Sequence, residues 1–386
     1  MREPHLVSRM QGFGTTIFDT MTELARGYRA VNLGQGFPDD DPPPEVANAA
    51  MGAIQVGHNQ YAPGSGIADL REAIARHQLR FHSLRYDAET EVTVTAGATE
   101  AIATSVLALC EMGDEVIVLE PFYDSYPAAV SLAGARHRSV PLQAPDFRLD
   151  LAALQAAVGP RTRAIIVNSP HNPTGRVFDD MELASIARLC NEHDLVAISD
   201  EVYEHLVHVG SHRPLASFPG MRDRTITISS AAKTFAVTGW KIGWICAPPA
   251  LTTAVRTVKQ FLTYSNGTPF QHAVAVGLDL PDEFYTDLTA RYRSRRDRLC
   301  DGLEKAGFTV REPAATYFVT VDVRDIGFDD GLSFCMNLPE RVGVVGIPVV
   351  AFHDDVEAGR PFVRFAYCRS EATLDEGIRR LANLRA

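Results

Sequence analysis

The stretch RAIIVNSPHNPTGRVFDDMELASIARLCNEHDLVAISD, residues 163–200, contains two short apolar runs separated by an amphipathic segment. The runs Arg163–Asn168 and Leu195–Ser199 have the length and β-branched content of buried strands, and Asp179–His193 has the periodicity of a helix. A strand, a crossover helix and a second strand in this order predict two parallel strands of one sheet, covered by helices.

The same alternation continues on both sides, from about residue 90 to residue 250. The other candidate strands are Glu91–Thr95, Glu115–Leu119, Arg136–Pro141, Thr225–Ser229 and Lys241–Ala247. The other amphipathic stretches are Thr99–Glu111 and Pro249–Thr263. This pattern predicts an α/β fold with a mostly parallel seven-stranded sheet between helices.

The C-terminal part of the chain has a different character. A long charged helix, Pro281–Ala306, precedes the separate strands Thr316–Val321 and Phe362–Tyr367 and a closing helix, Glu371–Arg385. A chain of 386 residues is long enough for two cores. We therefore predict a large α/β domain, residues 47–285, and a small α+β domain formed by residues 1–46 and 286–386.

Composition restricts the class of protein. A net charge of −11 argues against nucleic acid or anionic lipid as the main partner, and no apolar run approaches the ~20 residues that span a bilayer. The first residues, Met1–His5, show no signal-peptide pattern. The six cysteines are far apart in apolar stretches, which favours reduced core residues and a cytoplasmic protein.

Lysine is scarce in this chain. It occurs only at positions 233, 241, 259 and 305, so that 33 of the 37 basic residues are arginine. Lys233 and Lys241 nevertheless fall within one short stretch after a candidate strand. Arginine cannot form an imine with an aldehyde, whereas lysine can. The placement therefore indicates a lysine with a chemical role.

In an open α/β sheet, ligands bind beyond the carboxyl ends of the strands. The segments that follow candidate strands here are Ala96–Glu100, Glu120–Tyr126, Asn168–Gly175, Ser199–Tyr203 and Ser230–Lys233. They supply small residues that open a helix, an aromatic ring, an asparagine on each side of a Pro-His pair, a carboxylate and a lysine. Together these are the groups that pyridoxal phosphate requires.

Two motifs make a resemblance specific: Asn172-Pro173-Thr174-Gly175, and Ser230-x-x-Lys233 followed by Gly239-Trp240-Lys241-x-Gly243. With them, the chain resembles the class I/II aminotransferases of fold type I. It is most similar to the branch of kynurenine–glutamine, methionine and N-succinyldiaminopimelate aminotransferases. The resemblance extends from Asn32–Pro38 to Val363–Phe365.

The resemblance implies that the chain binds pyridoxal 5'-phosphate as an imine with Lys233. The residues that would hold the phosphate are Gly97, Ala98, Thr99, Ser230 and Lys241, with Tyr61 contributed by the partner subunit of a homodimer. Those that would contact the pyridine ring are Tyr123 on its face, Asn172 and Tyr203 at its hydroxyl oxygen, and Asp200 at its nitrogen.

The resemblance also implies transfer of an amino group from an amino acid to a 2-oxo acid by a ping-pong mechanism. Arg364 would bind the substrate α-carboxylate as a bidentate fork, assisted by the backbone of Gly36 and by Asn172, and Phe18 would lie against the substrate side chain. The amino donor stays open. N-succinyldiaminopimelate would need a distal arginine, whereas methionine, glutamine or kynurenine would suit the aromatic residues Phe18, Tyr61, Tyr123 and Phe270.

Other functions are compatible with parts of this sequence. A cysteine-conjugate β-lyase or an amino-acid oxidase would use the same residues, so the reaction type stays open at this point. A zinc site could be sought in His205, His208 and His212, but these residues follow a strand end, and we expect solvated histidines and no metal. A protein that only binds ligands would not need the imine-forming lysine.

Overall fold

The computed structural model describes residues 5–385, and its largest feature is a mixed sheet of eight strands. In spatial order the strands are β2 (Val92–Ala96), β9 (Ile242–Cys246), β8 (Thr225–Ser230), β7 (Val196–Asp200), β6 (Thr162–Asn168), β3 (Glu115–Glu120), β4 (Arg136–Gln143) and β5 (Arg148–Leu149). The strands from β8 to β4 are parallel, whereas β9 runs antiparallel to both of its neighbours.

The predicted fold class is confirmed, and all seven expected strands are present. The strand count differs by one. The eighth strand, β5, pairs antiparallel with the end of β4 through only two residues, Arg148 and Leu149. A segment of two residues carries no readable alternation of apolar and polar positions, which is why the sequence pattern did not reveal it.

Apolar side chains cover both faces of this sheet. On β3, Val116 and Val118 pack in one buried cluster, and Ile117 and Leu119 pack in another. The first cluster includes residues of helices α4 (Gly97–Leu109), α5 (Ser125–Leu132) and α9 (Pro249–Lys259), and the second includes residues of α7 (Asp180–Glu192). Successive side chains of a strand point to opposite faces, so a run of consecutive apolar residues needs a cover on each side.

The remaining helices around this sheet are α2 (Pro44–Gln55), α3 (Ala68–His82), α6 (Leu151–Ala156), α8 (Ala231–Thr234) and α10 (Thr268–Leu278). Helix α8 is a single turn that begins directly after β8. It projects its residues from the carboxyl end of a central strand, where the site is found.

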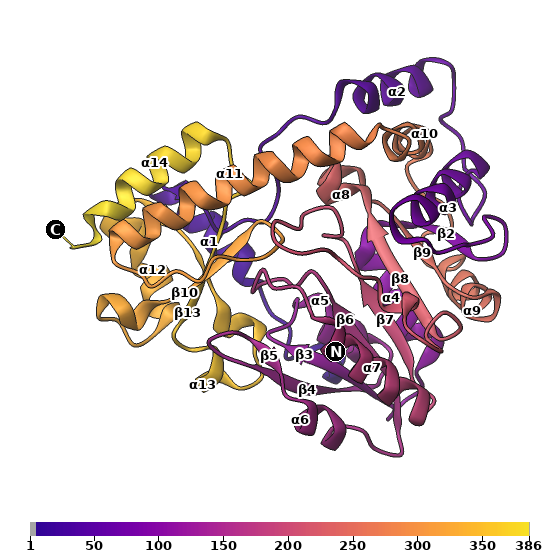
Figure 1. Ribbon diagram of the computed structural model, residues 1–386, viewed down its shortest axis with the longest axis horizontal. Helices are drawn as coiled ribbons and strands as arrows, with labels where there is room; N and C mark the ends of the chain where they lie inside the picture. The colour runs from indigo at the N-terminus through magenta and orange to yellow at the C-terminus, as the bar shows by residue number, and fades with distance from the viewer. Residues whose placement is uncertain (1–4, 386) are drawn as a thin grey trace.

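A second group of elements combines the C-terminal part of the chain with the N-terminal helix α1 (Figure 1). Its helices are α1 (Ile17–Gly27), α11 (Asp282–Ala306), α12 (Gly331–Val342), α13 (Val356–Gly359) and α14 (Glu371–Leu381). Its strands are β1 (Val31–Asn32), β10 (Phe318–Asp322), β11 (Val344–Val345), β12 (Ile347–Pro348) and β13 (Phe362–Ala366). Strands β10, β13 and β12 form an antiparallel sheet, and β1 pairs with β11.

The division into two domains stays a prediction. The boundary at residues 46/47 falls inside α2 and that at 285/286 falls inside α11, while residues 1–4 and 386 lie outside the described part of the chain. The expected helix Glu371–Arg385 ends as an α-helix at Leu381 and continues as a 3-10 turn, Ala382–Arg385. All six cysteines are buried and unpaired. None of the helices in residues 5–385 is long and apolar enough to cross a membrane.

Candidate active site

A cavity of about 260 Å³ lies where β6, β7 and β8 end and α4 begins. This volume is many times the ~10–15 Å³ that a cavity needs to hold one water molecule, so the cavity can take a small organic group. The predicted site residues that line it are Phe18, Gly36, Gly97, Ala98, Thr99, Tyr123, Asn172, Asp200, Tyr203, Ser230, Lys233, Lys241 and Arg364. The structure thus brings together every predicted site residue except Tyr61.

Lys233 enters the cavity from α8. Its Nζ lies 3.5 Å from the carbonyl oxygen of Gly36 and 5.8 Å from the ring centre of Tyr203. None of the described carboxylates forms an ion pair with it. Burial lowers the pKa of Lys233 to about 8, because the charged form loses its hydration. A larger fraction of the amine is therefore neutral near physiological pH, as nucleophilic attack requires.

Asp200 ends strand β7 as a buried carboxylate. Its Oδ2 accepts a hydrogen bond of 2.7 Å from the hydroxyl of Tyr126, and the side chain of Asn168 donates to its backbone carbonyl at 2.9 Å. Burial raises the pKa of Asp200 to about 6, although the bond from Tyr126 opposes the rise. A cationic nitrogen placed against this carboxylate would favour the ionised form and offset the cost of burial.

The start of α4 is shaped for close approach by a ligand. Gly97 has φ +72°, a left-handed conformation that favours glycine, and it follows β2 directly. A Cβ on Gly243 of β9 would lie 2.6 Å from the carbonyl carbon of Gly97, so only glycine lets the two segments meet. Free N–H groups in the first turn, with Ser230 and Lys241 beside them in the lining, form an arrangement that suits an anion.

Arg364 lies on β13 and is buried. Its Nη1 donates to Oδ1 of Asn172 at 2.8 Å and its Nη2 donates to the carbonyl of Gly34 at 3.0 Å, while its Nε has no partner among the described residues. The guanidinium lies 4.0 Å from the ring centre of Phe318. Burial lowers the pKa of Arg364 to about 10. A buried cation that has only neutral partners is suited to bind an anion from solution.

Two tyrosines contribute to the cavity wall without titrating near neutral pH. Burial raises the pKa of Tyr123 to about 12 and also holds the pKa of Tyr203 above its ordinary value. Both hydroxyls therefore stay protonated and can donate hydrogen bonds, and both rings present flat apolar faces.

Comparison with known proteins agrees with this geometry. Residues 28–381 match the family model for aminotransferase class I and II. The chain belongs to the class I and II aminotransferases. It is accordingly an enzyme that transfers amino groups, and its family and its structural neighbours are generally dependent on pyridoxal phosphate.

Relatives of the aminotransferase carry several names. A probable N-succinyldiaminopimelate aminotransferase of Mycobacterium tuberculosis is 53% identical, with 98% of both chains covered, and the structure of N-succinyldiaminopimelate aminotransferase from that organism has a TM-score of 0.96. The methionine aminotransferase of Escherichia coli is 38% identical, with 98% of both chains covered. The human kynurenine–oxoglutarate transaminase 3 is 36% identical over 95% of this chain and 87% of its own. The branch expected from the motifs is confirmed.

Tyr61 is the one predicted residue of the aminotransferase that lies away from the cavity. Its side chain is 83% exposed, and its ring contacts Tyr264 edge-on, with 5.7 Å between ring centres. Phe270, considered as a substrate contact, stacks on Trp240 with 4.7 Å between ring centres and is not among the lining residues.

Sequence reasoning assigned no role to several residues of the aminotransferase that line the cavity: Gln35, Phe37, Tyr126, Asn168, Thr238 and Phe318. Two of them carried a usable signal. Tyr126 belongs to Glu120–Tyr126, the segment after a candidate strand in which Tyr123 is singled out, and the two rings lie edge to face with 5.8 Å between their centres. Asn168 is the last residue of β6, and the asparagine pair around Pro170-His171 included it.

The three histidines considered for zinc do not converge, and the expectation that they are solvated is wrong, because His208 is buried and the side chain of His212 is only 3% exposed. His205 lies with its Nε2 2.7 Å from Nε2 of His77, whereas His208 bonds a backbone carbonyl and His212 bonds a buried glutamate. His77, Glu204 and His205 each bring one ligand atom within 4.8 Å of the others. Glu204 pairs with a different histidine at 2.6 Å and accepts from a serine hydroxyl, whereas Nδ1 of His77 has no partner among the described residues.

Proposed function

We propose that this aminotransferase binds pyridoxal 5'-phosphate in the cavity and moves an amino group from an amino acid to a 2-oxo acid. One observation carries the proposal: two cationic side chains, the half-buried Lys233 and the buried Arg364, line one cavity with the carboxylate Asp200, and no described carboxylate forms an ion pair with either cation. A lysine for an aldehyde, an acid for a ring nitrogen and an arginine for a carboxylate are the three groups that this chemistry needs.

The other lining residues fit the cofactor. The start of α4 at Gly97–Thr99, with Ser230 and Lys241, would hold the phosphate. Tyr123 would lie on the ring, Asn172 and Tyr203 would donate to its hydroxyl oxygen, and Asp200 would pair with its nitrogen. Lys233 would attach the cofactor covalently through Nζ. When bound, the cofactor withdraws electrons from the α-carbon of the substrate.

The side chains of the protein then orient the substrate and move a proton. Arg364, supported by Asn172, would fix the α-carboxylate so that the α-carbon lies beside Lys233. Lys233, once released by the incoming amine, would take the α-proton through Nζ and return it. Asp200 would place a negative charge against the ring nitrogen. Because amino acid and 2-oxo acid share one carboxylate anchor, they must bind in turn.

Two observations bear on the identity of the amino donor, and they favour different donors. The relative that is 53% identical supports N-succinyldiaminopimelate. Among the residues that line the cavity, however, the cations are Lys233, Lys241 and Arg364, so a distal carboxylate of this donor would have to meet a residue beyond the lining. The aromatic wall of Phe18, Phe37 and Phe318 would suit a neutral donor such as methionine or kynurenine. The names of the relatives reported above include no β-lyase or oxidase.

A panel of single half-reactions tests the proposal. The loaded enzyme is mixed with N-succinyldiaminopimelate, methionine, glutamine or kynurenine in the absence of a 2-oxo acid, and the cofactor spectrum is followed. We expect at least one donor to convert the cofactor fully to its amino form, with one equivalent of 2-oxo acid released. A cysteine S-conjugate is added as a further substrate: release of ammonia, pyruvate and the free thiol from it would indicate a β-lyase instead, and oxygen consumption with any donor would indicate an oxidase. Conversion by no donor would contradict the proposal.

We also propose a homodimer in which Tyr61 completes the phosphate site of the partner subunit. Tyr61 and its contact Tyr264 are exposed, as are Val56, Phe261 and Leu262 in the same two loops. Exposed apolar side chains that cluster in this way mark an interaction surface. A shared site also explains why Tyr61 is absent from the lining of its own cavity.

Hybrid dimers test this arrangement. Inactive Lys233→Ala protein and Tyr61→Ala protein are mixed under conditions of subunit exchange, so that each hybrid has one lysine-bearing subunit facing an intact Tyr61. Random exchange should restore about a quarter of wild-type activity, because half of the dimers are hybrids with one intact site of two. Activity that never exceeds the sum of the separate variants, despite exchange shown by mass spectrometry, would place Tyr61 in a role within its own subunit.

A further inference from the structure

The segment Gly34–Asp39 forms part of the cavity wall but belongs to no helix or strand. It carries two atoms that matter for the site. The carbonyl of Gly34 accepts from Arg364 at 3.0 Å, and the carbonyl of Gly36 lies 3.5 Å from Nζ of Lys233. A segment without a hydrogen-bond ladder of its own keeps its place only if other groups hold its backbone.

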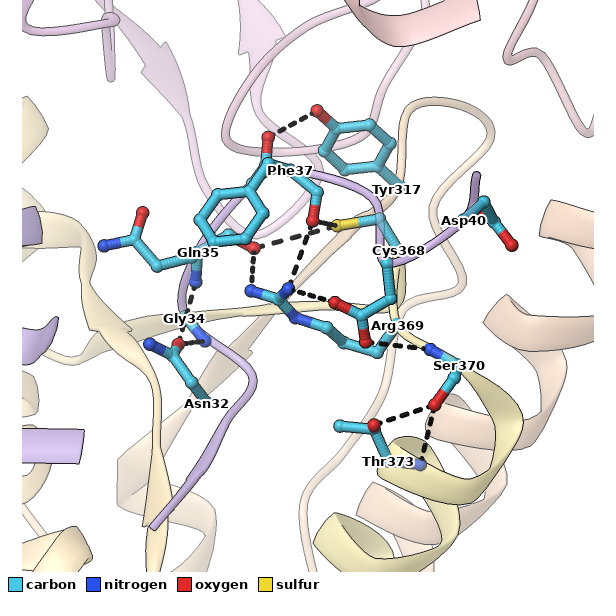
Figure 2. A network of polar contacts seen from close by, with 12 residues as sticks. Asn32, Gly34, Gln35, Phe37, Asp40, Tyr317, Cys368, Arg369, Ser370 and Thr373 are labelled. Carbon is cyan, nitrogen blue, oxygen red and sulfur yellow. Dashed lines mark hydrogen bonds and ion pairs between the residues drawn. The ribbon is translucent and has the colours of Figure 1, made fainter. Parts of the chain in front are cut away.

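Arg369 donates hydrogen bonds to the backbone of this segment (Figure 2). Its Nη2 donates to the carbonyl of Gln35 at 2.9 Å, and its Nη1 donates to the carbonyl of Phe37 at 3.2 Å and to Oδ1 of Asp39 at 2.7 Å. The side chain of Arg369 is buried, and its guanidinium lies 4.6 Å from the ring centre of Phe37. Arg369 therefore bonds the residues on both sides of Gly36.

Neighbouring residues also form contacts that hold the segment Gly34–Asp39 in place. The second oxygen of Asp39 accepts from the backbone N–H of Ser370 at 3.1 Å, and the backbone N–H of Asp39 donates to the carbonyl of Cys368 at 3.0 Å. The thiol of Cys368 lies 3.4 Å from the carbonyl of Phe37, and the hydroxyl of Tyr317 donates to the carbonyl of Gly36 at 2.6 Å. Each carbonyl from Gln35 to Phe37 thus has a side-chain donor.

We propose that Arg369 is a positioning residue for the substrate carboxylate, acting through the backbone of Gln35–Asp39 on Gly36 and Arg364. The inference rests on the proposed function. The guanidinium reaches two carbonyls and a carboxylate from two separate nitrogens in one plane, whereas the three donors of a lysine ammonium share one nitrogen and cannot reproduce this spread. The phosphate seat at the start of α4 has no contact with Arg369, so the effect should fall on substrate binding and spare the cofactor.

The chain offers a matched control in Arg295. It is buried like Arg369, and it forms a bidentate pair with Asp40, the residue next to Asp39, at 2.6 and 2.7 Å. Arg295 makes no hydrogen bond to a carbonyl of Gly34–Phe37. Replacing either arginine by glutamine removes a buried ion pair, but only Arg369→Gln releases the segment that carries Gly36.

The experiment compares Arg369→Gln, Arg369→Lys and Arg295→Gln in the loaded enzyme. For Arg369→Gln we expect the KM for both the amino donor and the 2-oxo acid to rise by about tenfold or more, with kcat much less affected, because a displaced anchor weakens binding. Cofactor affinity, measured by spectral titration, should not change. Arg369→Lys should restore part of the loss, and Arg295→Gln should keep a wild-type KM even where its melting temperature falls.

Hydrogen exchange gives a readout that needs no turnover. The peptide that covers residues 33–40 should exchange faster in Arg369→Gln than in Arg295→Gln, with or without cofactor. If Arg369→Gln does not fold, Asp39→Asn serves instead, since it removes the charged partner of the guanidinium and should shift both KM values in the same direction. A wild-type KM in these variants, with equal exchange, would overturn the proposal. A wild-type enzyme that converts no donor would contradict the proposed function instead, and the exchange data would still test Arg369.

Discussion

Replacing Lys233 by alanine should lower the rate of transamination by at least about 10⁴-fold, because one side chain supplies both the covalent attachment of the cofactor and the movement of the α-proton. The pH-sensitive absorbance that arises from the lysine–cofactor linkage should vanish as well. Lys233→Arg should be equally inactive although it keeps a positive charge, since a guanidinium does not condense with an aldehyde. Stopped-flow absorbance and steady-state assays measure both effects.

Lys259 provides the control for this experiment. It is buried, the loss of hydration lowers its pKa as it lowers that of Lys233, and its Nζ donates to the carbonyl of Tyr264 at 2.7 Å, outside the cavity. Lys259→Ala should keep the absorbance and the half-reaction even if stability falls. Normal turnover in Lys233→Ala would remove the central assignment of the site.

Replacing Arg364 by lysine should raise the KM for the amino donor by roughly tenfold to a hundredfold, the range expected when charge-assisted hydrogen bonds are lost. The lysine keeps the charge but loses the two-pronged match to a carboxylate, and it cannot reproduce the bonds to Asn172 and Gly34. Cofactor content should stay normal, because the cofactor would be held by residues of the large sheet.

Initial rates at varied donor, together with the ratio of cofactor to protein, measure these two properties. Arg296→Lys is a suitable control, since Arg296 is buried on α11 and donates to the carbonyl of Pro313 away from the cavity. Loss of cofactor from Arg364→Lys with an unchanged KM would show that Arg364 serves the cofactor instead of the substrate.

The strands of the large sheet could be predicted from the sequence because apolar runs and amphipathic helices alternate regularly there. The rule that ligands bind at the carboxyl ends of strands then located Asp200, Ser230 and Lys233, each of which ends or follows a buried strand. Gly36 and Arg364 came from the resemblance alone. They lie on a loop and on a strand of a different sheet, and no local pattern relates either of them to β7 or β8.

Residues that act through distant contacts could not be predicted. The bond from Tyr126 to Asp200 depends on how α5 is rotated above the sheet. The contact of Arg369 with Asp39 joins residues 330 positions apart. The chain contains many arginines, and the sequence around each one does not indicate which carboxylate it will contact. Partner choice is set by tertiary packing, which periodicity does not record.

Because β9 pairs antiparallel with β8, the length of the segment that joins these two strands is constrained. The chain leaves the sheet after Ser230 and re-enters it at Ile242. Lys233 and Lys241 therefore lie in one connecting segment, and the pairing of β8 with β9 fixes both of its ends. An inserted or deleted residue there would alter the spacing between the two amines, whereas the turn between β4 and β5, at the outer edge of the sheet, lies away from the cavity. Natural variants should therefore keep the segment between β8 and β9 at a constant length.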